Sequence, residues 1–549
     1  MDIRTGADIT AAEGKRTSVK LLRLGGVLML VNGVLLAPWW VLTGGLTTPW
    51  VALEAVVIVG AFSMLPRKPW APYAASAVAL LVAFFTIIGF GDTTLLLSLG
   101  RPLNLYLDVW LLSSARALLV GGLGPVLAVS ALALLSAGIA LLTGLLGWLL
   151  TSIRVESRVL SARLTGLGIV VFVGAGLTAE RVPVLAPHVD APTVRLVRDQ
   201  IRRFVAIINE REWFAEALSV SADSYAALPG LLSRLEGRDV IFAFIESYGV
   251  TALYDPRYSP VVGPRLDDFQ ARMDAAGLYV VSGKLVQPSQ GGQSWFGHGS
   301  VLSGVWLDNQ LRYDMLLSSG RETLIDDFRR AGYRTVAVMP AITKPWPEGE
   351  RFGYDEIFAA PHIGYAGPPL NWVTMPDQFV WSFLENSIRG VDDRPLFAEL
   401  GLISSHAPWT PILPVLDDWD AIGDGAIFAQ FEDTGVRPED LWREADRIRE
   451  HYAMSVEYAV HAMAAYAERY VDDRTLLIVL GDHQPAPLIT GEGATWDVPV
   501  HVISGDRALL EPFIDWGFSE GAWPNPDPER ETLGVDYFRD WFIRAYSGS

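Results

Sequence analysis

Long runs of apolar, uncharged residues in the first third of the chain restrict its fold more than any other feature. Residues 124–153 contain no charged side chain, and most of residues 19–180 is similarly apolar. A helix needs about 20 consecutive apolar residues to cross the hydrocarbon core of a bilayer. The sequence therefore predicts an N-terminal, all-α bundle of membrane-spanning helices, which accounts for a hydrophobic fraction of 50% in a chain of 549 residues.

The apolar runs divide into about five predicted spans. They cover residues 24–42, 50–65, 71–90, 124–153 and 164–177. The stretch 91–123 mixes apolar residues with acids and bases, which favours one or two helices lying in the outer interface. The first 18 residues are polar, and we expect them to form a disordered cytoplasmic tail.

Basic residues in the short loops predict the orientation of the bundle. The amino end, the turn at 66–69 and the loop at 154–163 are rich in Lys and Arg, which is typical of cytoplasmic loops. An odd number of spans places everything after the last span outside the cytoplasm, whereas an even number would place it inside. We therefore expect a membrane domain over 19–181, a linker with juxtamembrane helices over 182–237, and an extracytoplasmic domain over 238–549.

Composition excludes several classes of function. The net charge of −19 argues against a nucleic-acid partner, because phosphate backbones are bound by dense Lys and Arg surfaces. The chain contains no cysteine, so disulfides, thiolate metal ligands and a cysteine nucleophile are all excluded.

From residue 238 onwards, short apolar runs alternate with longer helical patterns. Strands are predicted at 240–245, 278–282, 335–339, 396–403, 476–480 and 498–503, with helices at 321–331, 377–389 and 444–470 among them. Such alternation is typical of an α/β domain in which helices cover both faces of a mostly parallel sheet. Ligands of such domains gather at the carboxyl ends of the strands.

Two predicted strands end in side chains that can bind a metal. Glu246 follows the run 240–245, and Asp482 with His483 follows 476–480. Two carboxylates and an imidazole suit zinc or manganese. Each group alone could instead be a structural cap of the next turn, but their matching positions after two strands favour a shared site.

Two further segments contain a residue that could take part in catalysis or substrate binding. Ser294 follows a glycine pair at 291–292 and precedes a predicted helix, where its hydroxyl could face an anion or simply cap the helix. His406 follows the strand at 396–403, where it could contact a substrate phosphate, protonate a leaving oxygen, or pack against Trp409.

Together these segments resemble the extracellular domain of the lipoteichoic acid synthase and phosphoglycerol transferase family, a sulfatase-like branch of the alkaline phosphatase superfamily. The resemblance covers roughly residues 238–505. It implies one divalent metal ion, usually manganese, with zinc and magnesium as alternatives. The implied ligands are Glu246, Ser294, Asp482 and His483, with Ser294 also the nucleophile. The implied substrate-contacting residues are His406, which is also catalytic, then Trp346 and Arg351 ahead of the G-Y-D motif at 353–355, and His298, one helical turn beyond Ser294.

The chain also departs from the family pattern. Its nucleophile is serine instead of the commoner threonine, and no Ser/Cys-x-Pro-x-Arg motif surrounds it, which argues against formylglycine and true sulfatase chemistry. We expect a multi-pass protein of the bacterial inner membrane that transfers a phospho-group through a phosphoserine. Its donor would be a lipid such as phosphatidylglycerol, and its acceptor a glycan or glycerol phosphate. The alternatives are a periplasmic phosphodiesterase or sulfatase-like hydrolase, and a non-catalytic protein that binds an anionic lipid or glycan.

Overall fold

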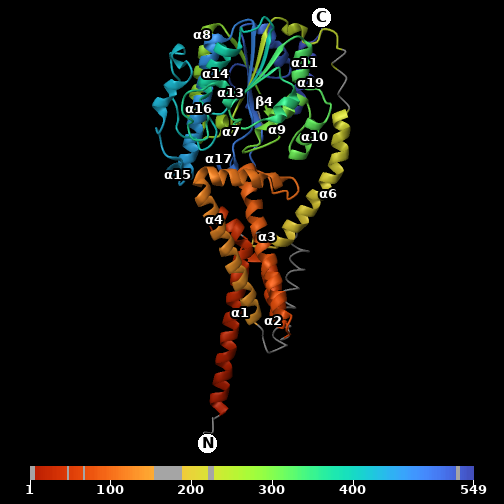
Figure 1. Cartoon of the computed structure of the whole chain (residues 1–549), viewed down its shortest axis with the longest axis vertical. Helices are drawn as coiled ribbons and strands as arrows, with labels where there is room; N and C mark the ends of the chain where they lie inside the picture. The colour runs from red at the N-terminus through yellow and green to blue at the C-terminus, as the bar shows by residue number, and fades with distance from the viewer. Residues whose placement is uncertain are drawn as a thin grey trace. The chain divides into compact units, whose positions relative to one another are not determined.

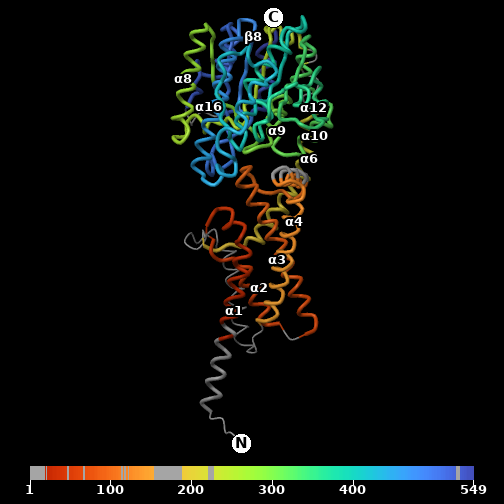
Figure 2. The backbone as a smooth tube through the Cα atoms, turned by 60° about the vertical axis from the view of Figure 1, so that its left-hand side comes forward, coloured from red at the N-terminus to blue at the C-terminus, as the bar shows by residue number. Residues whose placement is uncertain are grey.

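The structure is a computed structural model, which describes residues 6–45, 49–65, 68–153, 188–219, 225, 228–526 and 532–548. The chain forms two compact units (Figures 1 and 2). The first comprises Met1–Leu96 and Arg101–Asn209, and the second comprises Leu97–Gly100 and Glu210–Ser549.

Apolar helices make up most of the first unit. They are α1 (Gly6–Leu42), α2 (Leu53–Met64), α3 (Ala71–Leu99) and α4 (Leu111–Ser152). Among the described residues, three segments are long and apolar enough to cross a membrane: Leu22–Leu42, Ala71–Leu99 and Leu123–Ser152. The predicted second span corresponds to α2, a shorter apolar helix, and the predicted fifth span lies outside the described residues. The N-terminal helical unit is thus confirmed, while the number of five spans stays a prediction.

One sequence-based expectation for this unit was wrong. From Gly6 onwards the polar amino end is helical, whereas the sequence predicts disorder. The stretch 91–123 does contain a separate helix: α3 continues to Leu99, a short 3-10 turn follows at Asp108–Trp110, and α4 begins at Leu111 but is kinked at Gly124, whose φ of 75° and ψ of 160° are not helical. Residues 111–123 thus form a helix of their own, and its place at the outer interface stays a prediction. Arg101 donates hydrogen bonds of 3.0 and 2.8 Å to Asp108, so two of the charges that suggested an interface neutralise each other.

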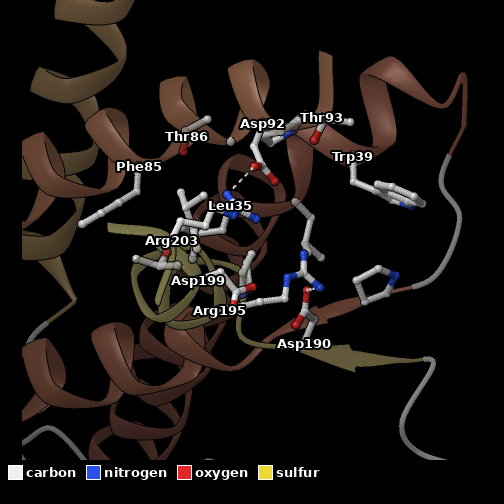
Figure 3. Close-up of a pocket in the computed structure, with 17 residues that line it drawn as sticks. Leu35, Trp39, Phe85, Thr86, Asp92, Thr93, Asp190, Arg195, Asp199 and Arg203 are labelled. Atoms are coloured by element: carbon white, nitrogen blue, oxygen red, sulfur yellow. Dashed lines mark ion pairs between the residues drawn. The ribbon is translucent and has the colours of Figure 1, made fainter. Parts of the chain in front are cut away.

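A small cavity lies where α1 and α3 meet the start of α6 (Pro192–Ser219) (Figure 3). It has a volume of about 180 Å³ and a mixed lining of apolar and charged side chains. Arg195 pairs with Asp190 at 2.7 Å, and Arg203 lies 3.6 Å from Asp92. These pairs offset part of the basic charge of α6, which lies within the linker with juxtamembrane helices that the sequence predicts over 182–237. A short parallel pair, β1 (Val51–Ala52) and β2 (Val189–Asp190), completes the unit.

An eight-stranded sheet organises the second unit. Its order is β10-β4-β9-β8-β3-β7-β5-β6. The strands are β3 (Asp239–Ile245), β4 (Tyr279–Val286), β5 (Arg334–Met339), β6 (Glu356–Ala359), β7 (Leu396–Leu402), β8 (Thr475–Gly481), β9 (Asp497–Ser504) and β10 (Ser519–Glu520). Neighbours from β8 to β6 are parallel, whereas β9 is antiparallel to both β8 and β4. The predicted mostly parallel sheet is confirmed, and all six predicted strands are present.

Helices cover both faces of this sheet, as the sequence predicts (Figure 1). One face carries α8 (Ser259–Ala276), α14 (Asp377–Phe383) and α16 (Ala445–Tyr470), and the other carries α9 (Ser294–Ser303), α11 (Leu324–Arg330) and α19 (Phe538–Tyr546). Alternate residues of β3 enter the two cores, with Ile241, Ala243 and Ile245 on one side and Val240, Phe242 and Phe244 on the other. Burial on both faces explains the uninterrupted apolar sequence of this strand.

Shorter helices connect these elements. They are α7 (Thr251–Tyr254), α10 (Gln310–Ser318), α12 (Pro347–Phe352), α13 (Ala360–Ile363), α15 (Pro438–Leu441), α17 (Pro487–Thr490) and α18 (Glu511–Asp515). At the carboxyl edge of the sheet, Ile245 of β3 lies opposite Leu402 of β7 and Gly481 of β8. The segments that follow these three strands therefore leave the sheet side by side.

Candidate metal centre and active site

Three side chains with metal-binding atoms converge at this edge. The amide N of Glu246 donates to the carbonyl of Leu402 at 2.9 Å, and the amide N of Asp482 donates to the carbonyl of Ile245 at 3.1 Å. Nε2 of His483 lies 3.3 Å from Oε1 of Glu246 and 3.7 Å from Oδ2 of Asp482. One ligand atom from each of the three residues lies within 4.8 Å of the other two, so a single cation could contact all of them.

The two nitrogens of His483 have different environments. Nδ1 lies 2.9 Å from the carbonyl of Gln484, which can only accept, so Nδ1 carries the hydrogen. Nε2 is buried and has no hydrogen-bond partner. A backbone acceptor on one ring nitrogen, with a free lone pair on the other, is how metal-binding histidines are oriented. An unpartnered imidazole nitrogen between two carboxylates fits a divalent cation.

Burial and charge perturb the pKa values of these three groups. Burial disfavours the charged form of Glu246, but His483 and His406 nevertheless hold the pKa of its carboxyl well below its usual range. Burial and the neighbouring Glu246 carboxylate raise the pKa of Asp482 to about 7. Burial opposes protonation of His483, but the two carboxylates raise its pKa to about 9. Without a cation, protons balance the charge of the cluster, one of them on Nε2 of His483. A bound cation would displace that proton and take up the Nε2 lone pair.

Ser247 fixes the turn that carries Glu246. Its φ of 56° lies in the left-handed region, which few residues other than glycine adopt. Its amide N donates to Oδ1 of Asp482 at 2.7 Å, and its hydroxyl donates to Oε1 of Glu246 at 2.9 Å. Tyr452 donates to its carbonyl at 3.0 Å. Sequence reasoning missed this positioning role, for which the only signal was a serine directly after the acid.

Gly481 lets the two carboxylate segments approach each other. A Cβ atom at this position would lie 1.8 Å from the carbonyl oxygen of Tyr248, so no larger residue fits without moving the backbone. The glycine before Asp482 and His483 is therefore part of what brings them to Glu246.

Ser294 is the first residue of α9, as the glycine-rich sequence before it predicts. Gly291, Gly292 and Gln293 all have positive φ, which turns the chain sharply into the helix. The amide N of Gly291 donates to the carbonyl of Gln484 at 2.8 Å. A Cβ atom on Gly297 would lie 2.8 Å from the carbonyl oxygen of Asp482, so the first turn of α9 packs directly on the Asp482 backbone.

His406 lies on the segment that follows β7. The hydroxyl of the preceding Ser405 donates to the carbonyl of Glu246, which ties this segment to the turn of the metal cluster. Nδ1 of His406 donates to the carbonyl of Ala407. Trp409, the alternative packing partner, stacks on Trp442 with ring centroids 5.7 Å apart and planes at 7°.

His298 makes a contact that the sequence did not reveal. Its Nδ1 lies 2.6 Å from Oε1 of Glu399, and the hydroxyl of Tyr354 donates to the other carboxylate oxygen. Its ring stacks on Phe244 with centroids 3.7 Å apart. Burial and the Glu399 carboxylate raise the pKa of Tyr354 well above its usual value, which keeps its hydroxyl protonated as a donor.

The two other predicted substrate-contacting residues lie at α12. Trp346 precedes this helix, and its ring covers Gly349. Arg351 is exposed in the last turn of the helix. Their contact with a substrate stays a prediction, whereas the structure does bring Glu246, Asp482 and His483 together.

Comparison with known proteins supports the fold. The model of the sulfatase family matches residues 302–500, a range that includes His406, Asp482 and His483 but begins after Glu246 and Ser294. This match confirms the sulfatase-like domain that the resemblance implies. No curated protein matches the chain in sequence.

Several solved structures are similar to the chain at low sequence identity. Lipooligosaccharide phosphoethanolamine transferase A (EptA) from Neisseria meningitidis is 12% identical, with 90% of this chain and 87% of that chain covered and a TM-score of 0.46. The lipoteichoic acid synthase LtaP from Listeria monocytogenes is 13% identical, with 52% and 71% covered and a TM-score of 0.35. The phosphoglycerol transferase GacH from Streptococcus pyogenes, solved with sn-glycerol-1-phosphate, is 13% identical, with 54% and 74% covered and a TM-score of 0.33.

Proposed function

Since this chain carries a sulfatase-family domain after helices that are apolar enough to span a membrane, we propose that it is a membrane-anchored, metal-dependent phospho-group transferase. It would act on a lipid phosphodiester through a covalent phosphoserine at Ser294. The proposal thus specifies four things: the nucleophile, the metal, the lipid donor, and a catalytic domain placed outside the inner membrane.

The observation that supports the proposal most directly is the environment of the His483 imidazole. Its Nε2 is buried without a hydrogen-bond partner and lies between two carboxylates that come from different strands. Such an arrangement leaves an uncompensated polar atom in the protein interior unless a cation occupies it. Glu246, Asp482 and His483 would hold that cation, with Ser294 as a fourth ligand. Manganese is our first choice, and zinc and magnesium are the alternatives.

When bound, a divalent cation supplies positive charge that lowers the pKa of a neighbouring hydroxyl and neutralises a transferring phosphoryl group. The protein residues do the rest. Ser294 Oγ attacks phosphorus in line, the bond from phosphorus to the lipid oxygen breaks, and His406 protonates that oxygen. Attack by an acceptor hydroxyl then releases Ser294, with a glycan or glycerol phosphate giving transfer and water giving hydrolysis.

Four side chains would bind the headgroup. His406, His298, Trp346 and Arg351 are the proposed contacts, of which Arg351 is a permanent cation suited to a phosphate oxygen. Phosphatidylglycerol is the proposed donor, because a catalytic domain tethered beside the outer leaflet meets lipid headgroups at high effective concentration.

The test offers headgroup-labelled phosphatidylglycerol and manganese to the full-length protein in micelles. Wild type should release diacylglycerol and carry label on Ser294, while Ser294→Ala should do neither. Label that ends on a glycan or glycerol phosphate identifies a transferase, and free glycerol phosphate identifies a hydrolase. Equal release of diacylglycerol by both proteins would remove Ser294 from the reaction.

A further inference from the structure

Glu399 is an acid in a place where acids are rare. It lies in the middle of β7, between neighbours Phe242 on β3 and Ala337 on β5, and its side chain is 1% exposed. A carboxylate buried inside a central strand is costly unless its oxygens are satisfied. Both oxygens of Glu399 are satisfied here, one by His298 and one by Tyr354.

These contacts determine which ring nitrogen of His298 carries the hydrogen. An ionised carboxylate only accepts, so the 2.6 Å contact places a hydrogen on Nδ1 and leaves Nε2 as the ring nitrogen that can accept a proton. The stacked ring of Phe244 prevents the imidazole from rotating freely. Glu399 would also stabilise the imidazolium that forms when Nε2 takes up a proton.

The helical spacing places His298 one turn after the nucleophile. It lies four residues after Ser294 on α9, on the same helical face and roughly 6 Å along the axis. Side chains on a helix lean toward its amino end, which is the end that carries Ser294. Phe244, on which the imidazole rests, is in β3, two residues before Glu246.

We propose that Ser294, His298 and Glu399 form a catalytic triad, in which His298 is the general base for the nucleophile and Glu399, held by Tyr354, positions it. This proposal deepens the proposed function, on which it rests for the reaction catalysed. As the Oγ–P bond forms, the Ser294 proton moves to Nε2 of His298, and the bond from phosphorus to the leaving oxygen breaks. When the acceptor hydroxyl attacks phosphorus, its proton passes to His406, which gave its own proton to the first leaving oxygen. The bond from phosphorus to Oγ breaks, and His298 returns the proton to Ser294.

The proposed triad gives His298 and His406 different roles. His406 would protonate the leaving oxygen, whereas His298, besides its contact with the headgroup, would take the proton of Ser294. A substrate whose leaving group departs without a proton distinguishes them, and bis(4-nitrophenyl) phosphate releases such a group because nitrophenolate is a stable anion. With this substrate His298 stays necessary and a general acid does not.

The experiment measures hydrolysis of bis(4-nitrophenyl) phosphate by the full-length protein in micelles with manganese, together with bound metal. We expect His298→Ala to lower kcat by about 10²–10⁴-fold with unchanged metal content, a far larger change than any in KM, as loss of a general base does. Added imidazole should restore part of this loss in His298→Ala and none in Ser294→Ala. Glu399→Gln and Tyr354→Phe should lower kcat by progressively smaller factors, and His461→Ala, on the opposite face of the sheet, should equal wild type.

Several results would overturn the triad. A His298→Ala protein with wild-type kcat would remove the base, and one that loses its metal and gains nothing from imidazole would make His298 structural. A different result would contradict the proposed lipid reaction alone. If the protein cleaves the aryl diester in a Ser294-dependent way but releases no diacylglycerol, the lipid donor is refuted and the triad is not. A wild-type protein that cleaves neither substrate would refute both.

Discussion

Nε2 of His483 lies 3.3 Å from Oε1 of Glu246, although the two residues belong to distant parts of the sequence. The contact exists because β3 and β8 are parallel neighbours with Ile245 in register with Gly481. Each strand therefore delivers its next residues to the same point. The cluster of possible metal ligands therefore follows from the register of two strands and needs no flexible loop.

The first prediction concerns metal removal. Purified wild-type protein should hold about one divalent cation, and both Glu246→Ala and His483→Ala should hold none. A chelator should lower the melting temperature of wild type, because a ligand present at 100 times its Kd stabilises the folded state by about 2.7 kcal/mol. The two variants should show no such response. A His483→Ala protein that keeps a full equivalent of metal would contradict the site.

Gly481 gives a steric prediction. A Cβ atom there would lie 1.8 Å from the carbonyl of Tyr248, so Gly481→Ala must displace either strand end. We expect a loss of about 1–3 kcal/mol in unfolding free energy, as overpacking usually costs, together with weaker metal binding. Gly320→Ala is the matched control, since a Cβ atom added there would meet no other atom within 4 Å. The measurements are the melting temperature and the metal content of both variants. If Gly481→Ala and Gly320→Ala give the same values, the close approach of residue 481 to the Tyr248 carbonyl is contradicted.

The buried carboxyl group of Asp377 should make the stability of the folded protein depend on pH. Its Oδ1 accepts the amide hydrogen of Ser404 at 2.8 Å, its Oδ2 is buried without a partner, and burial raises its pKa to about 6. The folded state therefore binds this proton more tightly than the unfolded state, whose pKa is about 3.9. The stabilisation is complete below about pH 4 and is lost as pH rises through 6, with a maximum of about 3 kcal/mol.

Asp377→Asn cannot titrate and should remove this component. The variant should gain stability relative to wild type as pH rises from 5 to 7.5, which melting curves at each pH would measure. A difference between the two proteins that stays constant across this range would mean that Asp377 does not hold the proton.

Much of the fold and part of the site could be predicted from the sequence. Buried strands such as 240–245 and 476–480 are continuous apolar runs, so their ends, and with them Glu246 and Asp482, stand out. The short strand β6 (Glu356–Ala359) does not stand out, because four residues carry too little periodicity. The direction of β9 is not visible either, since parallel and antiparallel buried strands have the same apolar composition.

Glu399 shows where such reasoning stops. Within the run Leu396–Leu402 it is one acid among apolar residues, and nothing local indicates that its partners are His298 and Tyr354. That pairing depends on α9 packing over β3 and on the chain after α12 reaching β7. Both are tertiary contacts between segments that share no pattern.

The orientation of the membrane unit gives a further prediction. A reporter enzyme fused after residue 190 should be active only outside the cytoplasm if the number of spans before it is odd. The basic loops predict a cytoplasmic amino end. A reporter that is active inside the cytoplasm would place the metal cluster on the wrong side for an outer-leaflet donor.

The last prediction concerns a buried ion pair between α11 and α19. Nε and Nη2 of Arg539 lie 2.9 and 2.8 Å from Oδ2 of Asp327, and the two side chains are 2% and 0% exposed. Removing one partner leaves the other charge buried and unpaired, which costs about 3–5 kcal/mol. We therefore expect Asp327→Ala to lower the melting temperature strongly, and Asp327→Leu combined with Arg539→Met to recover much of the loss.

Asp540 and Arg544 provide the matched control on α19 itself. They form an ion pair at 3.0 Å, but their side chains are 56% and 68% exposed. Solvent screens such a pair, so Asp540→Ala should change stability by less than about 1 kcal/mol. Because Nε donates to Oδ2 at a similar distance in both pairs, 2.9 Å from Arg539 and 3.0 Å from Arg544, a large difference between the two alanine variants would point to burial as the cause. Equal losses would instead show that burial does not raise the cost of breaking the pair.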